Sequence, residues 1–315
     1  TIWKHKSHFF KRAKSDWNVD LRSFDQHSRF IQNIAATVQY IFQRDLLEKL
    51  AALKSQTGAE YLYYSGGSAL NIKANTFLLQ NELFKEVYIP PCTNDSGLSI
   101  GAGAMVEWLK HGKVETHSPY LNNWGLRKSH YSFNTADIQK VVELLRNNKV
   151  VGVCNGFGES GPRALGNRSI LALPGSKELA RYVSEKLKGR EWYRPVAPVM
   201  LRRNLPYFVH HPRLSVLSKF MLMDFPVRPE RKKELAGVVH VDGTARIQTI
   251  DKREENPFLY DLLTNLDEGY KIKALLNTSF NAMGRPIVHT PEDARNEARD
   301  MGLDAVVVDG QLRGL

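Results

Sequence analysis

The sequence has few cysteines and no long hydrophobic run. Only Cys92 and Cys154 are present among its 315 residues, and their spacing does not fit a metal site. No apolar stretch approaches the roughly 20 residues that a membrane-spanning helix needs, and no signal-peptide pattern is present. These absences predict a reduced, cytoplasmic setting and no membrane partner.

The rest of the composition is that of a globular α/β protein. Hydrophobic residues make up 42% and charged residues 24%, and 315 residues suffice for two domains with their own cores. The formal net charge of +11 permits binding of nucleic acid or of an anionic ligand without selecting between them. The first 24 residues are basic and aromatic, and they predict either a nucleic-acid arm or a crossover segment of a larger domain.

Hydrophobic periodicity predicts alternating helices and short strands. Helices are expected at 25–53, 71–80, 100–110, 137–146, 176–187 and 292–300. Strands are expected at 61–64, which we predict to be buried, at 86–89 and 150–153, and at 305–308 as the last strand. The turn-rich stretch at about 111–134 is expected to be a linker.

The most informative segment is Gly161 to Ser169, which reads GPRALGNRS. It places Arg163 and Arg168 among small, turn-forming residues, and a guanidinium group is a planar fork of donors that matches two anionic oxygens. The segment predicts a phosphate or carboxylate site, and the alternative is a surface turn whose arginines pair with local carboxylates. Arg168 is the weaker candidate, because it can instead pair with Glu159.

Two further segments have the same character. Lys188, Arg190 and Arg194 alternate in a way that suits one face of an extended strand, with a solvated strand edge as the alternative. Downstream, the apolar residues 274–276 lead into amides and hydroxyls that include Ser279 and Asn281, which can donate hydrogen bonds to an anion. An ordinary turn would explain that loop alone. The three segments together predict a phosphate-bearing substrate.

Several ordered motifs carry a family resemblance. GPRALGNRSIL, KGREWYRPVAPV, HVDGTARIQT and LLNTSFNAMGRPIVHTPEDA resemble the carboxy-terminal, YrdC-like domain of NodU/CmcH-type O-carbamoyltransferases. YSGGSALN at 64–71 and PPCTNDSG at 90–97 resemble the second half of the family's other domain, which has the actin-like ATPase fold. The resemblance implies a transfer half-domain at 1–115, a linker at 116–134 and a YrdC-like, carbamoyl adenylate-forming domain at 135–315.

The resemblance implies a two-step reaction. Carbamoyl phosphate and ATP, with Mg²⁺, would give carbamoyl adenylate, whose carbamoyl group then passes to a hydroxyl of a small molecule such as a sugar or an antibiotic. Carbamoyl phosphate would be bound by Arg163, Lys188, Arg190, Arg194, Ser279 and Asn281, of which the first three are catalytic. Gly66, Gly67 and Asn71 would lie against the nucleotide.

By the same resemblance, Asp95 would ligate divalent iron at the transfer site. The partner histidines of such a site belong to the first half of the actin-like domain, which we expect upstream in the same longer chain. A partner chain or a degenerate relative are the alternatives. His5 and His8 have a different spacing and are not assigned to the metal.

Two departures from the family pattern bear on activity. Phe157 stands where the family usually has a basic residue, and Arg285 stands where it often has glutamate. Two other functions therefore remain open: a relative acting in tRNA threonylcarbamoyl adenosine synthesis, and a non-catalytic scaffold of the same fold. For the carbamoyltransferase itself no nucleic-acid partner is expected.

Overall fold

The computed structural model describes residues 29–314 except 115–117, 124–130, 192 and 211–214. The chain divides into two compact units, Thr1–Thr57 and Gly58–Leu315. The basic, aromatic stretch at 1–24, with His5 and His8, lies outside the described residues. In the described part of the chain no helix is long and apolar enough to cross a membrane.

The described part of the first unit is one helix, α2 (Arg29–Thr57). The sequence predicted a helix at 25–53, and the helix is confirmed from Arg29 and continues one turn further. Lys54 lies in its last turn, where a cation interacts favourably with the helix dipole. The expected residues 25–28 fall outside the described chain.

The second unit begins with two short parallel strands, β1 (Tyr61–Tyr63) and β2 (Glu86–Tyr88). A turn of 3₁₀ helix, η1 (Gly67–Leu70), and helix α3 (Ile72–Gln80) connect them, and α4 (Gly97–His111) follows. The prediction that the first strand is buried is wrong, since Tyr61 and Tyr63 are 64% and 67% exposed. Their aromatic character indicates a strand but does not show that both faces are covered.

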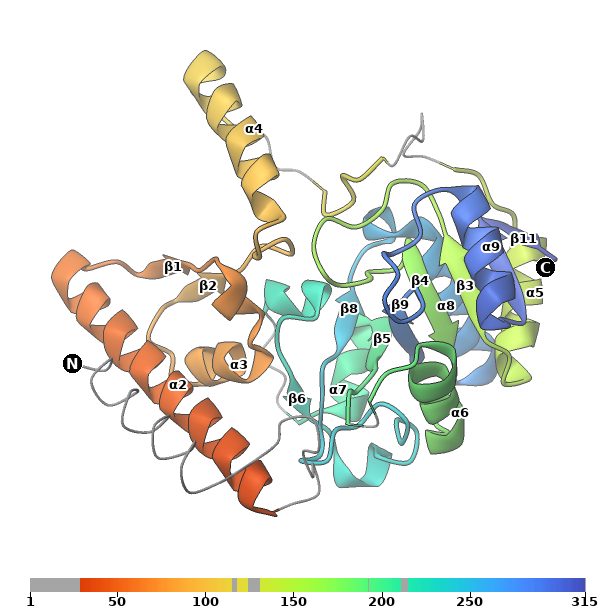
Figure 1. The fold of residues 1–315 in the computed structure, drawn as a ribbon, viewed down its shortest axis with the longest axis horizontal. Coiled ribbons are helices and arrows are strands. Elements are labelled where there is room, and N and C mark those ends of the chain that lie inside the picture. Colours follow the sequence, from red (N-terminus) through yellow and green to blue (C-terminus); the bar gives the residue numbers. More distant parts are fainter. Residues whose placement is uncertain (1–28, 115–117, 124–130, 192, 211–214, 315) are drawn as a thin grey trace. The chain divides into compact units, whose positions relative to one another are not determined.

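Seven strands form the main sheet in the order β11-β10-β3-β4-β9-β5-β8 (Figure 1). They are β3 (Val151–Cys154), β4 (Arg168–Ala172), β5 (Ala197–Leu201), β8 (Gln248–Ile250), β9 (Leu275–Ser279), β10 (Ala305–Val308) and β11 (Gln311–Arg313). The β10–β3 and β5–β8 pairs are parallel, and the other four pairs are antiparallel. The mixed α/β class predicted from the sequence is confirmed, although β10 is followed by β11 and is not the last strand.

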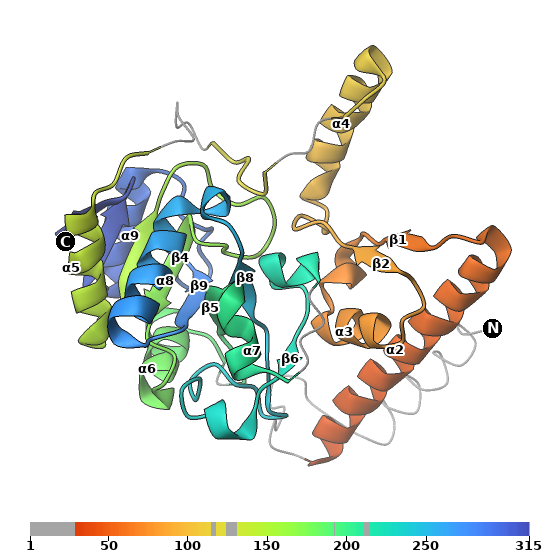
Figure 2. The same ribbon diagram turned by 180° about the vertical axis from the view of Figure 1, so that it is seen from behind.

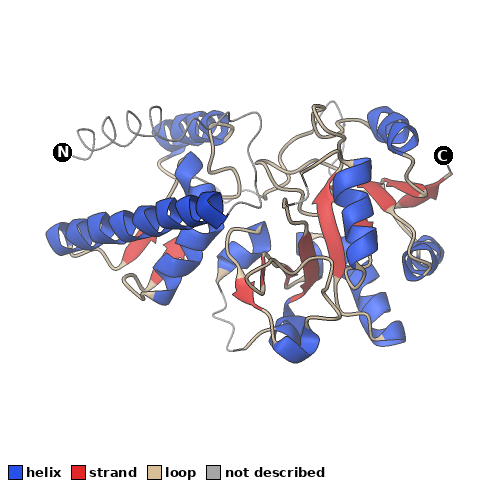
Figure 3. Cartoon of the chain, turned by 60° about the horizontal axis from the view of Figure 1, so that its bottom comes forward, coloured by secondary structure: helices blue, strands red, loops and turns tan. Residues whose placement is uncertain are grey.

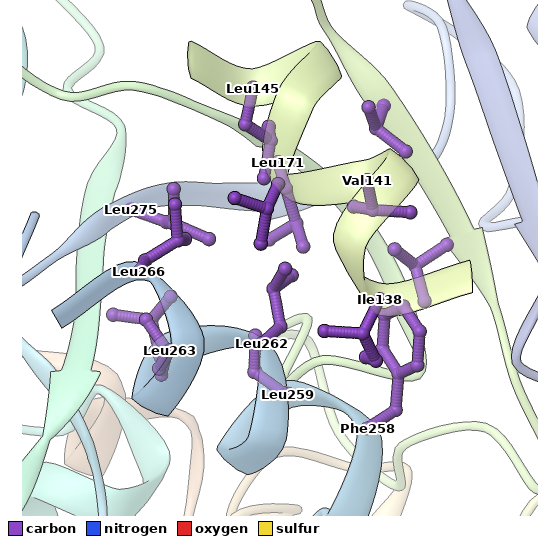
Figure 4. Close-up of a cluster of buried hydrophobic side chains, with 14 of the residues drawn as sticks. Ile138, Val141, Leu145, Leu171, Phe258, Leu259, Leu262, Leu263, Leu266 and Leu275 are labelled. Atoms are coloured by element: carbon purple, nitrogen blue, oxygen red, sulfur yellow. The ribbon is translucent and has the colours of Figure 1, made fainter. Parts of the chain in front are cut away.

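Helices cover both faces of this sheet (Figures 1 and 2). Helices α5 (Thr135–Arg146) and α8 (Pro257–Tyr270) pack on one face, and α9 (Pro291–Met301) packs against β10 and β3 on the other. Leu259, Leu262 and Leu266 recur at helical spacing along α8 and are fully buried against α5 and the strands (Figure 4). The apolar face of α8 therefore forms a large part of the main core.

Shorter elements complete the unit (Figure 3). They are α6 (Lys177–Arg181), the π-helical turn η2 (Tyr182–Leu187), η3 (Arg202–Asn204), α7 (Leu205–Phe208), η4 (Val216–Phe220), β6 (Phe225–Pro226), η5 (Pro229–Arg231), β7 (Thr244–Ala245) and η6 (Arg253–Glu255). The helix predicted at 176–187 is confirmed in extent, with its second half π-helical. The strand predicted for Lys188 to Arg194 is wrong: Gly189 has a φ of 60° in a turn, and β5 begins only at Ala197.

Polar contacts join α3 to the segment around β6 and β7. The Asn75 amide donates to the carbonyl of Leu222 at 2.9 Å, and the Lys73 ammonium lies 2.6 Å from the buried carboxylate of Asp224. Lys73 also contacts Asp242. Because Asn75 and Asp224 are buried, these contacts hold α3 against this segment.

Shortening Leu262 to alanine should lower the free energy of unfolding by about 2–5 kcal/mol, because the side chain is fully buried between α8, α5 and the sheet. Urea denaturation followed by circular dichroism measures this difference. Leu109→Ala is the matched control: Leu109 is 71% exposed, and its removal should change the free energy by less than about 0.5 kcal/mol. Equal losses in the two variants would contradict this assignment of the core.

Candidate active site

A loop between β3 and β4, residues 155–167, presents Arg163. The Glu159 carboxylate shapes this loop by accepting backbone N–H bonds from Leu165 at 2.6 Å, Asn167 at 2.8 Å and Arg168 at 3.2 Å. Glu159 is itself buried. A buried carboxylate that collects several N–H groups fixes a loop much as a bound anion would, so the segment around Arg163 is held in one conformation.

Arg168, the first residue of β4, has a structural role beside the same loop. Its guanidinium group donates to four backbone carbonyls, those of Asn155, Gly156, Asn167 and His289, at 2.8–3.0 Å. The predicted alternative, an ion pair with Glu159, is wrong, because Glu159 bonds the backbone of the loop instead. Arg168 is 1% exposed and directs its donors inward, which leaves it little capacity for a substrate.

Two glycines let this loop approach other segments closely. A Cβ atom on Gly161 would lie 2.3 Å from the carbonyl oxygen of Pro91, and one on Gly166 would lie 2.6 Å from the Asn256 amide. Both glycines have φ near +120°, a conformation that other residues rarely adopt. The loop that carries Arg163 therefore packs directly on the loop at 90–92.

Lys188 ends the π-helical turn and reaches across to β9. Its buried ammonium donates to the carbonyl and side-chain oxygens of Asn281 at 2.6 and 2.9 Å, and it also contacts the carbonyl of Ser279. The structure thus brings these three predicted site residues together. Lys188 also holds the chain at the end of β9, so its replacement should cost stability as well as binding.

Three guanidinium groups gather beside Lys188. Arg190 donates to the Ser279 hydroxyl at 3.3 Å, and both Arg163 and Arg190 lower the pKa of Arg246. Burial is the first cause of that shift, which brings the Arg246 pKa to about 9, and burial also lowers the pKa of Arg163 and of Arg190. Among the described residues no carboxylate forms an ion pair with these three groups, and only Glu191 has a minor opposing effect on Arg190.

This unpaired positive charge suits the binding of an anion. Buried guanidinium groups without countercharge are costly, and the Nε atoms of Arg163 and Arg246 are buried with no hydrogen-bond partner. A phosphate-bearing ligand supplies both the missing charge and the missing acceptors. We name Arg163, Lys188, Arg190, Arg246, Ser279 and Asn281 the cation cluster.

Sequence reasoning missed Arg246. It belongs to the HVDGTARIQT motif, which supported the family resemblance but was assigned no chemistry. The sequence offered little signal, because Asp242 and Asp251 lie within five residues of Arg246 and could have been its ion-pair partners. Only the fold shows that β8 lies next to β5 and so brings residue 246 towards the turn after Lys188.

Arg194 lies at the edge of the cluster. Its guanidinium group pairs with Glu191 at 2.7 Å and is 57% exposed, although its charge also lowers the pKa of Arg190. Arg194 lines a cavity of about 1000 Å³ whose rim carries further cations. Four of these form no ion pair among the described residues: Lys177, Arg181, Lys232 and Lys233.

A second cavity, of about 650 Å³, holds two other predicted residues. Gly66 and Asp95 both line it. Gly66 has a φ of 102°, and its N–H donates to the carbonyl of Thr93 at 2.9 Å. Gly67 begins the 3₁₀ turn η1 next to this cavity wall, whereas the side chain of Asn71 caps α3 by accepting the N–H of Ala74. Asn71 therefore acts on the helix end in this structure.

The residues around Asp95 do not by themselves fit an iron site. Asp95 is exposed at the start of α4, and no cluster of three or more His, Cys, Asp or Glu side chains able to hold a metal occurs in the described chain. One carboxylate supplies too few donors for iron, so no chemical step is assigned to a metal here.

Phe157 and Arg285, the two residues that depart from the family pattern, make different contacts. Arg285 pairs with Glu297 and Asp300 on α9, both at 2.7 Å, and is thereby held on that helix. Glu297 also accepts the N–H of Ala282, so this pair supports the turn after β9. The carbonyl of Phe157 accepts the amide of Asn167 within the Glu159 loop.

Replacing Arg246 with methionine should leave the ligand-free protein at least as stable and abolish most of the stabilisation that phosphate gives, because it removes a buried charge without a counterion. Thermal unfolding with and without inorganic phosphate measures both effects. Arg168→Met is the control: its four charge-assisted bonds, at about 1.5–3 kcal/mol each, should make that variant much less stable. A comparable loss in Arg246→Met would mean that Arg246 is structural.

Binding of a divalent anion should be coupled to proton uptake near neutral pH. Burial, and then the charge of Arg190, lower the pKa of Lys188 to about 7, and a bound anion should raise it again. Affinity for sulfate, whose own charge is constant in this range, should therefore fall as pH rises above about 7. Titration calorimetry in buffers of different ionisation enthalpy measures the protons taken up, and pH-independent sulfate binding would contradict the assignment.

Comparison with known proteins identifies the family of this chain. Residues 142–313, more than half of the chain, match the carbamoyltransferase carboxy-terminal domain, and residues 3–104 match the carbamoyltransferase amino-terminal domain. The chain is 32% identical over 296 residues to nodulation protein NolO of Bradyrhizobium diazoefficiens, covering 88% of this chain and 53% of that protein. It is 36% identical over 262 residues to nodulation protein U of Rhizobium tropici, covering 81% and 44% respectively. The chain thus spans about half the length of the curated relatives it matches.

Solved structures show more distant similarity. Full-length HypF, in a phosphate- and nucleotide-bound form, aligns with a TM-score of 0.40 and 15% identity over 57% of this chain and 23% of HypF. Sua5 of P. abyssi aligns with a TM-score of 0.38 and 13% identity over 56% of this chain and 46% of Sua5. The sequence matches, rather than these low similarities, decide the family. The chain belongs to the carbamoyltransferase family.

Proposed function

We propose that this protein is an O-carbamoyltransferase that forms carbamoyl adenylate and transfers its carbamoyl group to a hydroxyl of a small molecule. The observation that carries the proposal is the cation cluster, in which three half-buried guanidinium groups and the buried Lys188 form no ion pair with a carboxylate among the described residues. Carbamoyl phosphate, a small and densely charged anion, matches this deficit.

The first step would require water as a reactant. Carbamoyl phosphate and water give carbamate and inorganic phosphate, after which a carbamate oxygen attacks the α-phosphorus of ATP and pyrophosphate leaves. Arg163, Arg190 and Arg246 would bind the phosphoryl oxygens and stabilise the charge that moves among them. The fixed Glu159 loop and the Lys188 contacts would hold these donors in place before the substrate arrives.

The 1000 Å³ cavity beside Arg194 supports ATP as the second substrate. Four cations line it without an ion pair among the described residues: Lys177, Arg181, Lys232 and Lys233. They suit a triphosphate, because a triphosphate carries more negative charge than the cation cluster alone would neutralise. Mg²⁺ would accompany the nucleotide as it does in most ATP sites. The cavity floor includes Ala180, Val196 and Ala236, which offer an apolar surface.

The second step would take place in the 650 Å³ cavity that Asp95 and Gly66 line. There the acceptor hydroxyl oxygen attacks the carbamoyl carbon, AMP leaves and the hydroxyl proton is released. The proposal keeps the division into a transfer half-domain at 1–115, a linker at 116–134 and an adenylate-forming domain at 135–315. Iron at Asp95 would need ligands from outside the described residues, such as the half-domain that we place upstream in a longer chain in the cytoplasm.

Arg163→Ala should lower pyrophosphate release from ATP and carbamoyl phosphate by at least about a hundredfold, since it removes a donor aimed at developing charge. A coupled pyrophosphate assay measures the loss. Arg202→Ala is the matched control, because Arg202 pairs with Asp251 at 3.1 Å away from the cluster and its loss should leave the rate unchanged. If Arg163→Ala released pyrophosphate at the normal rate, Arg163 would not belong to the site.

Asp95→Ala should retain pyrophosphate release and block carbamoylation of the acceptor, because Asp95 lines the other cavity. Mass spectrometry of the acceptor, run beside the pyrophosphate assay on the full-length chain, separates the two steps. Parallel loss of both steps would contradict the division of the reaction between the two cavities.

A further inference from the structure

Three of the motifs that carry the family resemblance meet at one buried carbonyl group, that of Leu165. The Gln248 side-chain amide donates to this carbonyl at 2.9 Å, and its own oxygen accepts the Asn277 amide at 2.7 Å. The same Asn277 amide donates to the carbonyl of Ala164 at 3.3 Å. Leu165, Gln248 and Asn277 are each at most 2% exposed, so water does not compete for these bonds. We name the Leu165 carbonyl and the side chains of Gln248 and Asn277 the amide network.

The amide network is close in sequence to three members of the cation cluster. Each of its three residues is two positions along the chain from one of them. The pairs are Leu165 with Arg163, Gln248 with Arg246, and Asn277 with Ser279. Two residues span at most about 7 Å, so a shift of a network residue also moves the neighbouring cluster residue. The network therefore sets the spacing of groups that come from three separate segments.

Gln248 and Asn277 connect two strands that are not neighbours in the sheet. Strand β5 lies between β8 and β9, and the register pairs Val199 of β5 with Gln248 and Ala197 of β5 with Asn277. Because Ala197 and Val199 are alternate residues of one strand, both amides lie on the same face of the sheet. Their bond therefore crosses over β5 and links β8 directly to β9. Backbone bonds do not make this link, because each strand pairs only with its neighbours.

The stretch that the sequence predicted to be a linker also holds the Leu165 carbonyl. The Tyr120 hydroxyl donates to it at 2.9 Å and accepts the Asn256 amide at 3.3 Å. The neighbouring carbonyl of Pro119 accepts the N–H of Ser160 at 2.7 Å. The Leu165 carbonyl thus accepts two side-chain bonds, one from β8 and one from this stretch. Residues 119–120 therefore support the loop that carries the first arginine of the cation cluster.

Resting on the proposed function, we infer that Gln248 is a positioning residue for the binding of carbamoyl phosphate and that Tyr120 assists it. Gln248 acts through the cation cluster and does not itself touch the substrate. The guanidinium groups of the cluster repel one another, so their segments need such a support. Without the Gln248 amide, the segments that carry Arg163 and Arg246 are free to separate. A displacement of about 1 Å in a site of this kind can cost about a hundredfold in rate.

Gln248→Met removes both bonds of the amide at nearly constant side-chain length. We expect its affinity for inorganic phosphate, measured by titration calorimetry, to fall at least about tenfold. Thr249→Val is the matched control: Thr249 is the next residue of β8, is equally buried, and bonds the Ser218 hydroxyl at 2.8 Å on the opposite face of the sheet. This control should lose stability in thermal unfolding but keep its phosphate affinity within about twofold. Normal affinity in Gln248→Met, or an equal loss in both variants, would overturn the inference.

Tyr120→Phe tests the contribution of the linker stretch, because it keeps the ring and removes only the hydroxyl. The Leu165 carbonyl retains its bond from Gln248 in this variant, so we expect a smaller loss of phosphate affinity, about threefold. Tyr120→Phe also decides the question if Gln248→Met does not fold. Unchanged phosphate affinity in Tyr120→Phe would then overturn the inference.

Pyrophosphate release by the full-length chain is measured in parallel, and Gln248→Met should lower kcat/KM for carbamoyl phosphate at least about tenfold. If the wild-type chain releases no pyrophosphate, the proposed function fails, while phosphate affinity still reports whether Gln248 positions the cluster. If the wild-type chain releases pyrophosphate and Gln248→Met does so with the same kcat/KM, the proposed function stands and this inference falls. If the wild-type chain neither binds phosphate nor releases pyrophosphate, both fall.

Discussion

The uncompensated positive charge of Arg163, Arg190 and Arg246 is the constraint around which this part of the molecule is organised. Guanidinium groups that repel one another at half-buried positions oppose folding, and here Arg163 lowers the pKa of both Arg190 and Arg246, while Arg190 lowers that of Arg246. The fold tolerates them because backbone and side-chain bonds elsewhere hold their segments in place. The resulting deficit of negative charge is what a phosphate-bearing substrate would relieve.

Two buried ionic groups provide that support without facing the substrate. Glu159 collects three backbone N–H groups of its own loop, and Arg168 donates to four carbonyls. Each satisfies main-chain atoms that an irregular buried loop would otherwise leave unpaired. The positions of the segments that carry the cation cluster therefore depend on Glu159 and Arg168, which are not part of the cluster themselves.

Apolar periodicity predicted several helices and strands, but it did not predict strands β4, β5, β8 and β11 of the main sheet. The sequence predicted the helices that correspond to α2, α3, α4, α5 and α9 but missed α8, whose leucines form much of the main core. It also predicted that Arg163, Lys188, Arg190, Ser279 and Asn281 come together, because their residue types and turn context indicate anion binding. It did not predict Arg246, since a strand order cannot be derived from local pattern. It wrongly predicted a strand at Lys188 and an ion pair for Arg168, because a glycine turn and main-chain acceptors decide those conformations.

The close approach of Gly161 to the Pro91 carbonyl has a consequence for protein engineering. At Gly161 the loop that carries Arg163 leaves no room for even one methyl group against Pro91. Grafting residues 90–92 from a relative would press on the loop that carries Arg163 unless the position of the Pro91 carbonyl were preserved. The two segments should therefore be exchanged together in a chimaera with a relative.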